Sequence, residues 1–234
     1  MIVINEKIKF QNPLIVTGFH SFGSVGTLAA QYLRDRLNAM EIGFLEVKSI
    51  PSAALLVKGE ILYPIRIFYD KRGKILIFES EIPLPSECGK EIAEDIAHFA
   101  AKVRAKQVVC LEGLAGKDKS EDEEVYVIFN DRSLAKNLKD LKILETGIMF
   151  GLSTEIMLKC KSLSIPSICI MAKAHREFPD GKAAANVLKA FGKLYHLKID
   201  LAPLIRESEL FERKMLELLR KAEEIGERPE KIYG

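Results

Sequence analysis

The chain has 234 residues, of which 48% are hydrophobic and 29% are charged, and its formal net charge is +2. That length and apolar content are enough for one large α/β domain or two small ones. The sequence has no basic block, which argues against nucleic acid as a partner, and no apolar run approaches the roughly 18 residues of a membrane-spanning helix.

Short apolar runs bounded by turn-forming residues predict the strands of an α/β fold. We expect strands at residues 14–17, 43–47, 55–57, 65–69, 75–79, 107–111, 125–129, 143–146 and 168–172. The run at 107–111 is almost continuously apolar, which is typical of a parallel sheet covered on both faces. Residues 70–73 predict the turn of an antiparallel hairpin between two of these strands.

Amphipathic segments between the strands predict helices on both faces of the sheet. The residues expected to cap or open these helices are Ser24, Ser86, Ser153 and Asp180. A further short helix is expected near residues 133–138. Because strands alternate with amphipathic helices, we predict a three-layer α/β fold with a mostly parallel sheet, and we assign residues 1–200 to this core domain.

The segment 201–225 predicts a separate C-terminal amphipathic helix. Its apolar residues recur in steps of four and three, an a/d pattern over three heptads flanked by charged residues. The apolar seam consists of Leu204, Phe211, Met215, Leu218 and Ile225. Such a seam can pack on its own domain or on a second copy of the chain, and the sequence leaves both arrangements open.

Glycine-containing loops follow three of the predicted strands, at residues 18–26, 111–116 and 146–153. A loop of this kind can bind phosphate at a helix N-terminus, but none carries a P-loop lysine or a dinucleotide fingerprint. His20 and Ser21 could act as base and nucleophile, and Glu112 as a catalytic carboxylate. We favour tight turns and close helix–sheet packing for the glycines and a helix cap or surface position for the glutamate.

The four cysteines are far apart in the sequence and include no C-x-x-C pair. They are Cys88, Cys110, Cys160 and Cys169. Two of them lie inside apolar strand-like runs, so we expect reduced and mostly buried thiols in a cytoplasmic protein. Neither the cysteines nor the four histidines have the spacing of a zinc site, and we expect no metal.

The chain ends in Ile232, Tyr233 and Gly234, which follow a polar stretch at 226–231 that suits a mobile tail. An aromatic ring one position from a free carboxylate makes a compact plug, and capture of a C-terminal carboxylate is a known mode of peptide recognition. This ending resembles the motif with which proteasome activators and assembly chaperones dock between the α-subunits of the 20S core particle.

Several segments in order along residues 1–200 resemble archaeal members of the proteasome assembly chaperone family. They are the loop Gly18-Phe19 to Gly26 before a helix with Tyr32-Leu33, the strand end Leu111-Glu112-Gly113, the pair Gly147 and Gly151, and residues 178–184. The resemblance implies a fold like that of purine nucleoside phosphorylases, used as a scaffold with no catalytic residue and no cofactor. It also implies homo-oligomers that bind the proteasome α-ring through Ile232, Tyr233 and Gly234.

Two functions from different classes follow. The first is an ATP-independent proteasome assembly chaperone or activator, a homo-oligomer whose C-terminal tails insert between α-subunits of the 20S proteasome. The alternative is an enzyme of the nucleoside phosphorylase or hydrolase type, with its site at the glycine-rich strand ends. A nucleotide-binding domain is a third reading, but it lacks a phosphate-binding lysine motif.

Overall fold

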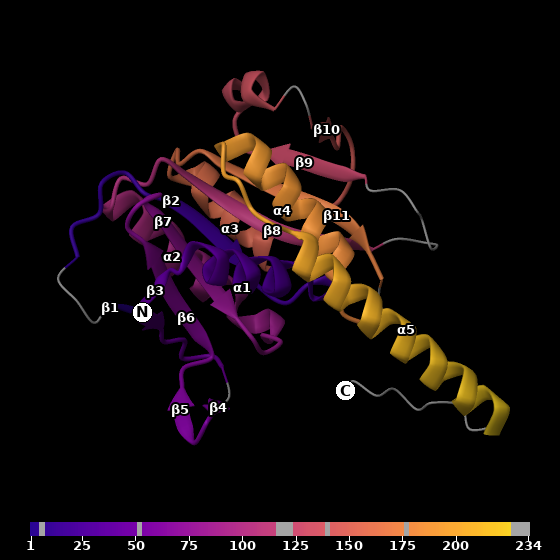
Figure 1. The fold of residues 1–234 in the computed structure, drawn as a ribbon. Helices are drawn as coiled ribbons and strands as arrows, with labels where there is room; N and C mark the ends of the chain where they lie inside the picture. The colour runs from indigo at the N-terminus through magenta and orange to yellow at the C-terminus, as the bar shows by residue number, and fades with distance from the viewer. Residues whose placement is uncertain (5–7, 51–52, 116–123, 139–140, 176–177, 226–234) are drawn as a thin grey trace.

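Figure 1 shows a computed structural model of the chain, which describes residues 1–4, 8–50, 53–115, 124–138, 141–175 and 178–225. The strands are β1 (Ile2–Ile4), β2 (Leu14–Gly18), β3 (Met40–Leu45), β4 (Leu55–Val57), β5 (Glu60–Leu62), β6 (Ile65–Asp70), β7 (Ile75–Ser80), β8 (Gln107–Ala115), β9 (Val125–Phe129), β10 (Lys142–Ile143) and β11 (Ser167–Ala174). The α-helices are α1 (Val25–Leu37), α2 (Gly89–Lys102), α3 (Leu152–Ser162), α4 (Gly181–Tyr195) and α5 (Ala202–Ile225). Short 3₁₀ helices are η1 (Phe22–Ser24), η2 (Ser86–Cys88) and η3 (Arg132–Asn137).

Nine strands form one sheet in the order β1-β3-β6-β7-β2-β8-β11-β9-β10. The middle strands β7, β2, β8 and β11 run parallel, as the sequence predicts, and β9 pairs in parallel with β10. The pairs β1–β3, β3–β6, β6–β7 and β11–β9 are antiparallel, so the sheet is mixed rather than mostly parallel. Parallel neighbours need a crossover, whereas the tight turn between β6 and β7 permits only an antiparallel pair.

Helices cover both faces of this sheet (Figure 1). One buried cluster joins α1 and α4 to the first face, and it includes Leu33 and Phe191, each with no exposed surface. The second cluster joins α2 and α3 to the other face, around Phe78 and Ile96. Burying side chains of this size contributes about 1.5–3 kcal/mol each, so both layers are held by the apolar faces that the sequence pattern predicts.

The expected hairpin turn and one expected helix cap are present. Asp70 accepts hydrogen bonds from the backbone N–H groups of Arg72 and Gly73, at 3.0 and 2.8 Å, which fixes the turn between β6 and β7. Asp180 accepts from the N–H of Ala183 at 2.9 Å, as an N-cap should. Ser86 begins η2, which continues directly into α2.

Neither of two expected serine caps makes a capping hydrogen bond, although Ser24 does stand at the N-cap position of α1. Ser24 adopts a left-handed conformation with φ of 50° and makes no capping hydrogen bond; Ser21 supplies the acceptor for α1 instead. Ser153 lies inside α3, which begins at Leu152 after Gly151. The hydroxyl of Ser153 is used elsewhere, because it donates to the carboxylate of Glu112.

Helix α5 packs on α4 by its first turns and then extends away from the body (Figure 1). Leu204 is buried, and a Cβ atom added to Gly181 would lie 2.8 Å from the Cβ of Ser208, so glycine permits the close approach of the two helices. The start of α5 agrees with the expected helix at 201–225, whereas the division into domains stays a prediction.

Candidate functional site

The predicted contact residues of the tail, Ile232, Tyr233 and Gly234, lie outside the described residues. Of the predicted seam, the structure describes the side chains of Leu204, which is buried on α4, and of Phe211, which is 38% exposed. The other seam residues, Met215, Leu218 and Ile225, belong to α5, but their side chains lie outside what the structure describes. Leu204 therefore packs within the chain, whereas Phe211 is only partly covered by it, and the role of the seam stays a prediction.

The loop at residues 18–26 is joined to the end of β8 by Ser21. Its Oγ accepts a hydrogen bond from the N–H of Gly26 at 3.2 Å and another from the N–H of Gly113 at 3.1 Å. A Cβ atom at Gly26 would meet the carbonyl oxygen of Phe19 at 2.4 Å, so close packing requires this glycine. The glycine is therefore explained by packing, as the sequence analysis favours.

Glu112 is not a helix cap, and it is half-buried at the end of β8 rather than on the surface. Its Oε2 accepts from Ser153 Oγ at 2.5 Å and its Oε1 from the N–H of Gly113 at 3.2 Å. Burial raises the pKa of Glu112, while hydrogen bonds from Ser153, Ser21 and Gly113 act in the opposite direction. The carboxylate thus ties α3 and the loop of Ser21 to the sheet.

The candidate catalytic residues are brought to one edge of the sheet but not into a catalytic arrangement. Nδ1 of His20 is 3.4 Å from the hydroxyl of Ser24, whereas the hydroxyl of Ser21 bonds to the backbone and faces Glu112. A base and nucleophile need to bond to each other and leave room for a substrate. Here the hydroxyls and the carboxylate satisfy one another, which is the geometry of a structural junction.

A buried ionic cluster that the sequence pattern did not predict lies beside this edge of the sheet. Glu79 lies opposite Gly18 in the register of β7 and β2 and is 1% exposed. Its Oε1 pairs with Arg34 and lies 3.7 Å from Nη2 of Arg66. Burial raises the pKa of Glu79 to about 7, even though the guanidinium groups of Arg34 and Arg66 act to lower it. The predicted hairpin turn could have revealed this cluster, because the register that it sets between β6 and β7 places Arg66 opposite Glu79.

All four cysteines are free and buried, as expected. Burial raises the pKa of Cys110 and of Cys160 to about 12, so both thiols stay protonated and unreactive near neutral pH. Within the described ranges, no group of three or more His, Cys, Asp or Glu side chains could hold a metal ion. Among the helices that the structure describes, none is both long and apolar enough to span a membrane.

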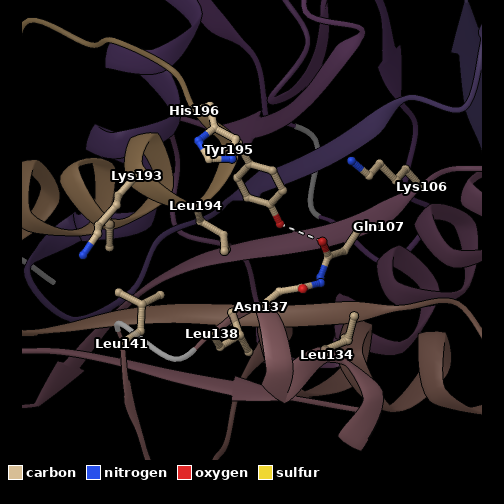
Figure 2. A pocket seen from close by; sticks show the side chains of 11 residues that line it. Lys106, Gln107, Leu134, Asn137, Leu138, Leu141, Lys193, Leu194, Tyr195 and His196 are labelled. Atoms are coloured by element: carbon tan, nitrogen blue, oxygen red, sulfur yellow. Dashed lines mark hydrogen bonds between the residues drawn. The ribbon is translucent and has the colours of Figure 1, made fainter.

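A cavity of about 410 Å³ lies at the opposite end of the central strands, where β8 begins (Figure 2). Leucines of η3 and α4 form its apolar wall, and Lys106, Lys193 and His196 are also among its lining residues. Tyr195 Oη donates to Gln107 Oε1 at 2.8 Å, and burial raises the pKa of this tyrosine. The cavity is away from the glycine loops, so it does not supply the crevice that the enzyme alternative expects there.

Comparison with known proteins gives a consistent result. The model of the PAC2 family matches residues 15–219. An uncharacterized protein of Methanocaldococcus jannaschii is 30% identical over 218 residues, which cover 92% of this chain and 89% of that protein.

Two solved structures from Pyrococcus furiosus have the same fold. PbaA, an archaeal homolog of proteasome-assembly chaperone, superposes with a TM-score of 0.86 at 27% identity, over 96% of this chain and 93% of that chain. PbaB, an archaeal proteasome activator, gives a TM-score of 0.82 at 21% identity, over 95% of this chain and 98% of that chain.

Proposed function

This chain belongs to the PAC2 family, and we propose that it is an ATP-independent proteasome-binding protein, either an assembly chaperone or an activator. The observation that carries the proposal is the likeness to PbaA, which extends over 96% of this chain at a TM-score of 0.86. The resemblance to archaeal proteasome assembly chaperones in the sequence leads to the same function.

The proposed mechanism is multivalent binding by a homo-oligomer to the α-subunits of the 20S proteasome. Helix α5 has 24 residues and therefore a length of ~36 Å, most of it beyond the body of the domain. The proposed tail begins after the end of this helix at Ile225. One tail binds weakly, whereas several tails on one oligomer share an effective concentration and bind much more tightly.

Three terminal residues would make the contact. Tyr233 is the aromatic anchor, Ile232 covers the rim of the pocket, and the carboxylate of Gly234 pairs with a lysine of the α-ring. The stretch 226–231 spans at most roughly 20 Å when extended, which is enough to reach a pocket from the end of α5. Support for this role comes from the helix that precedes these residues, since Leu210 and Phe211 on it are exposed.

We further propose that binding, not catalysis, is the activity. Support comes from the edge where the enzyme alternative places its site, because Ser21, Glu112 and Ser153 bond to one another and to the backbone. No observation in the described residues favours the phosphorylase or hydrolase alternative over this reading.

The test is a pull-down with an archaeal 20S core particle. Tyr233→Ala should weaken binding at least tenfold, because a buried aromatic anchor contributes ~2 kcal/mol and every subunit loses it. Two residues appended after Gly234 should have the same effect, since they move the carboxylate away from its partner. Tyr63, an exposed tyrosine on the body of the domain, provides the control Tyr63→Ala, which should bind like the parent. Equal binding by all four proteins would refute the tail mechanism.

A further inference from the structure

Two large apolar side chains stand almost fully in solvent just before α3. Ile148 is 85% exposed and Phe150 is 84% exposed, more than any other large apolar residue in the described part of the chain. Between them, Met149 packs against the core cluster beneath α2 and α3. The loop is thus anchored by its middle residue and presents its neighbours outward, as an interaction surface does.

This surface lies at the carboxyl edge of the central strands. Helix α3 follows it directly, and Ser153 in the first turn of α3 donates to Glu112 near the end of β8. The start of α3, two residues after Phe150, is therefore tied to β8.

Helix α5 leaves the body at the same edge. The N–H of Asp180 donates to the carbonyl oxygen of Gly23 at 2.8 Å, which places the start of α4 beside the loop of Ser21. Gly181 in the first turn of α4 then contacts Ser208 of α5. Beyond Ser208 the helix extends outward, with Leu210 58% exposed and Phe211 38% exposed (Figure 1).

The two apolar surfaces are on opposite faces of the sheet. Helices α4 and α5 lie on one face, whereas α3 and the loop of Ile148 belong to the other. The two surfaces therefore do not cover each other within one chain, whereas a second copy of the chain offers a complement to both. Both surfaces carry exposed charges of both signs, and Glu145 near the loop is available to pair with Arg213 or Lys214, which follow Phe211.

We propose that the surface of Ile148 and Phe150 is the docking site for helix α5 of a neighbouring copy, which rests on the homo-oligomer proposed above. A helix of one copy on a loop of the next is a heterologous contact, and such contacts form a ring when the rotation closes. Because α5 leads to the C-terminus, this arrangement sets every tail of the ring on one side. Multivalent binding to a ring of α-subunits requires that geometry.

Cross-linking between differently substituted chains tests the contact. The native thiols are buried, so a single engineered cysteine reacts selectively. We would mix F150C chains with F211C chains, allow subunits to exchange, and add a short bismaleimide. The expected product is a dimer of one F150C chain with one F211C chain. Ile61, which is 75% exposed on the separate hairpin of β4 and β5, gives the control I61C. Cross-linking of F211C to I61C as strongly as to F150C would overturn the assignment.

Light scattering provides an independent measurement. Replacing Ile148 and Phe150 by Glu should reduce the oligomer to monomers at micromolar concentration with an unchanged circular dichroism spectrum, while Ile61→Glu leaves the oligomer intact. A parent oligomer that survives the double change refutes this docking site and leaves the proposed function standing. A parent chain that is monomeric refutes the homo-oligomer itself and the docking site with it. Should the double variant fail to fold, the cross-linking result decides.

Discussion

Replacing Ser21 by alanine tests whether the junction at the carboxyl edge is structural. The hydroxyl accepts from the N–H groups of Gly26 and Gly113, and both glycines are buried. In Ser21→Ala, the N–H of Gly113 keeps a bond to Glu112 at 3.2 Å. The N–H of Gly26 lies in the first turn of α1, where no intrahelical acceptor exists. One buried donor therefore loses its partner completely.

The magnitude follows from these contacts. A hydrogen bond contributes about 1 kcal/mol net, and a buried donor left without an acceptor costs about 1–3 kcal/mol. We expect Ser21→Ala to lower the free energy of unfolding by about 2–3 kcal/mol. Urea unfolding followed by far-UV circular dichroism measures this difference. Parent and variant must be compared at one protein concentration, because association adds to the apparent stability.

Ser24→Ala is the matched control, three residues away in the same loop. The hydroxyl of Ser24 makes only a 3.4 Å contact with His20 and caps no helix, so its loss should change the free energy of unfolding by about 0.5 kcal/mol or less. Equal effects of the two substitutions would refute the junction. A stable Ser21→Ala protein that had lost a hydrolytic activity of the parent would instead restore the enzyme alternative.

Three further expectations concern the ionic cluster, the seam and the contact between α4 and α5. Burial raises the pKa of Glu79 from 4.5 to about 7, so the stability that it provides is complete below pH 4.5 and is lost as the pH rises through 7. Glu79→Gln should reduce the fall in unfolding free energy between pH 4.5 and 8 by about 3 kcal/mol, and equal falls in parent and variant would contradict this. Phe211→Glu combined with Leu218→Glu should dissociate the oligomer in light scattering; a lower melting temperature without dissociation would place the seam within one chain. Gly181→Ala should loosen the packing of α5 and speed its proteolysis, because the new Cβ atom would lie 2.8 Å from the Cβ of Ser208. This effect should outweigh the intrinsic preference of alanine for a helix, which is about 1 kcal/mol. An unchanged cleavage rate would argue against the contact between α4 and α5.

Periodicity was sufficient to predict most of the core. The strand at Val125–Phe129 has the predicted bounds, and strand β8 extends the predicted run at 107–111 by four residues. The spacing of apolar residues reports which side of a strand or helix is buried, and a sheet between two helical layers buries these sides in the same way in any such fold. Strand direction at the edges was not predictable in the same way, because it depends on which strands become neighbours.

Serine hydroxyls show where local reasoning fails. Ser24 and Ser153 stand where a cap is expected, yet the bonds that matter come from Ser21 to Gly113 and from Ser153 to Glu112, across large separations in sequence. A capping rule considers only neighbours along the chain, whereas a hydroxyl near a strand end bonds to whatever the fold brings close. The loop of Ile148 and Phe150 also gave no signal, because exposure of an apolar side chain cannot be read from a pattern of burial.

The shortness of the outermost strands limits how these molecules can aggregate. The sheet ends in β1 with three residues and in β10 with two. Long exposed strand edges invite chains to join strand to strand without end, and short edges discourage such fibrillar growth. Addition of further chains strand to strand is therefore disfavoured at both ends of this sheet.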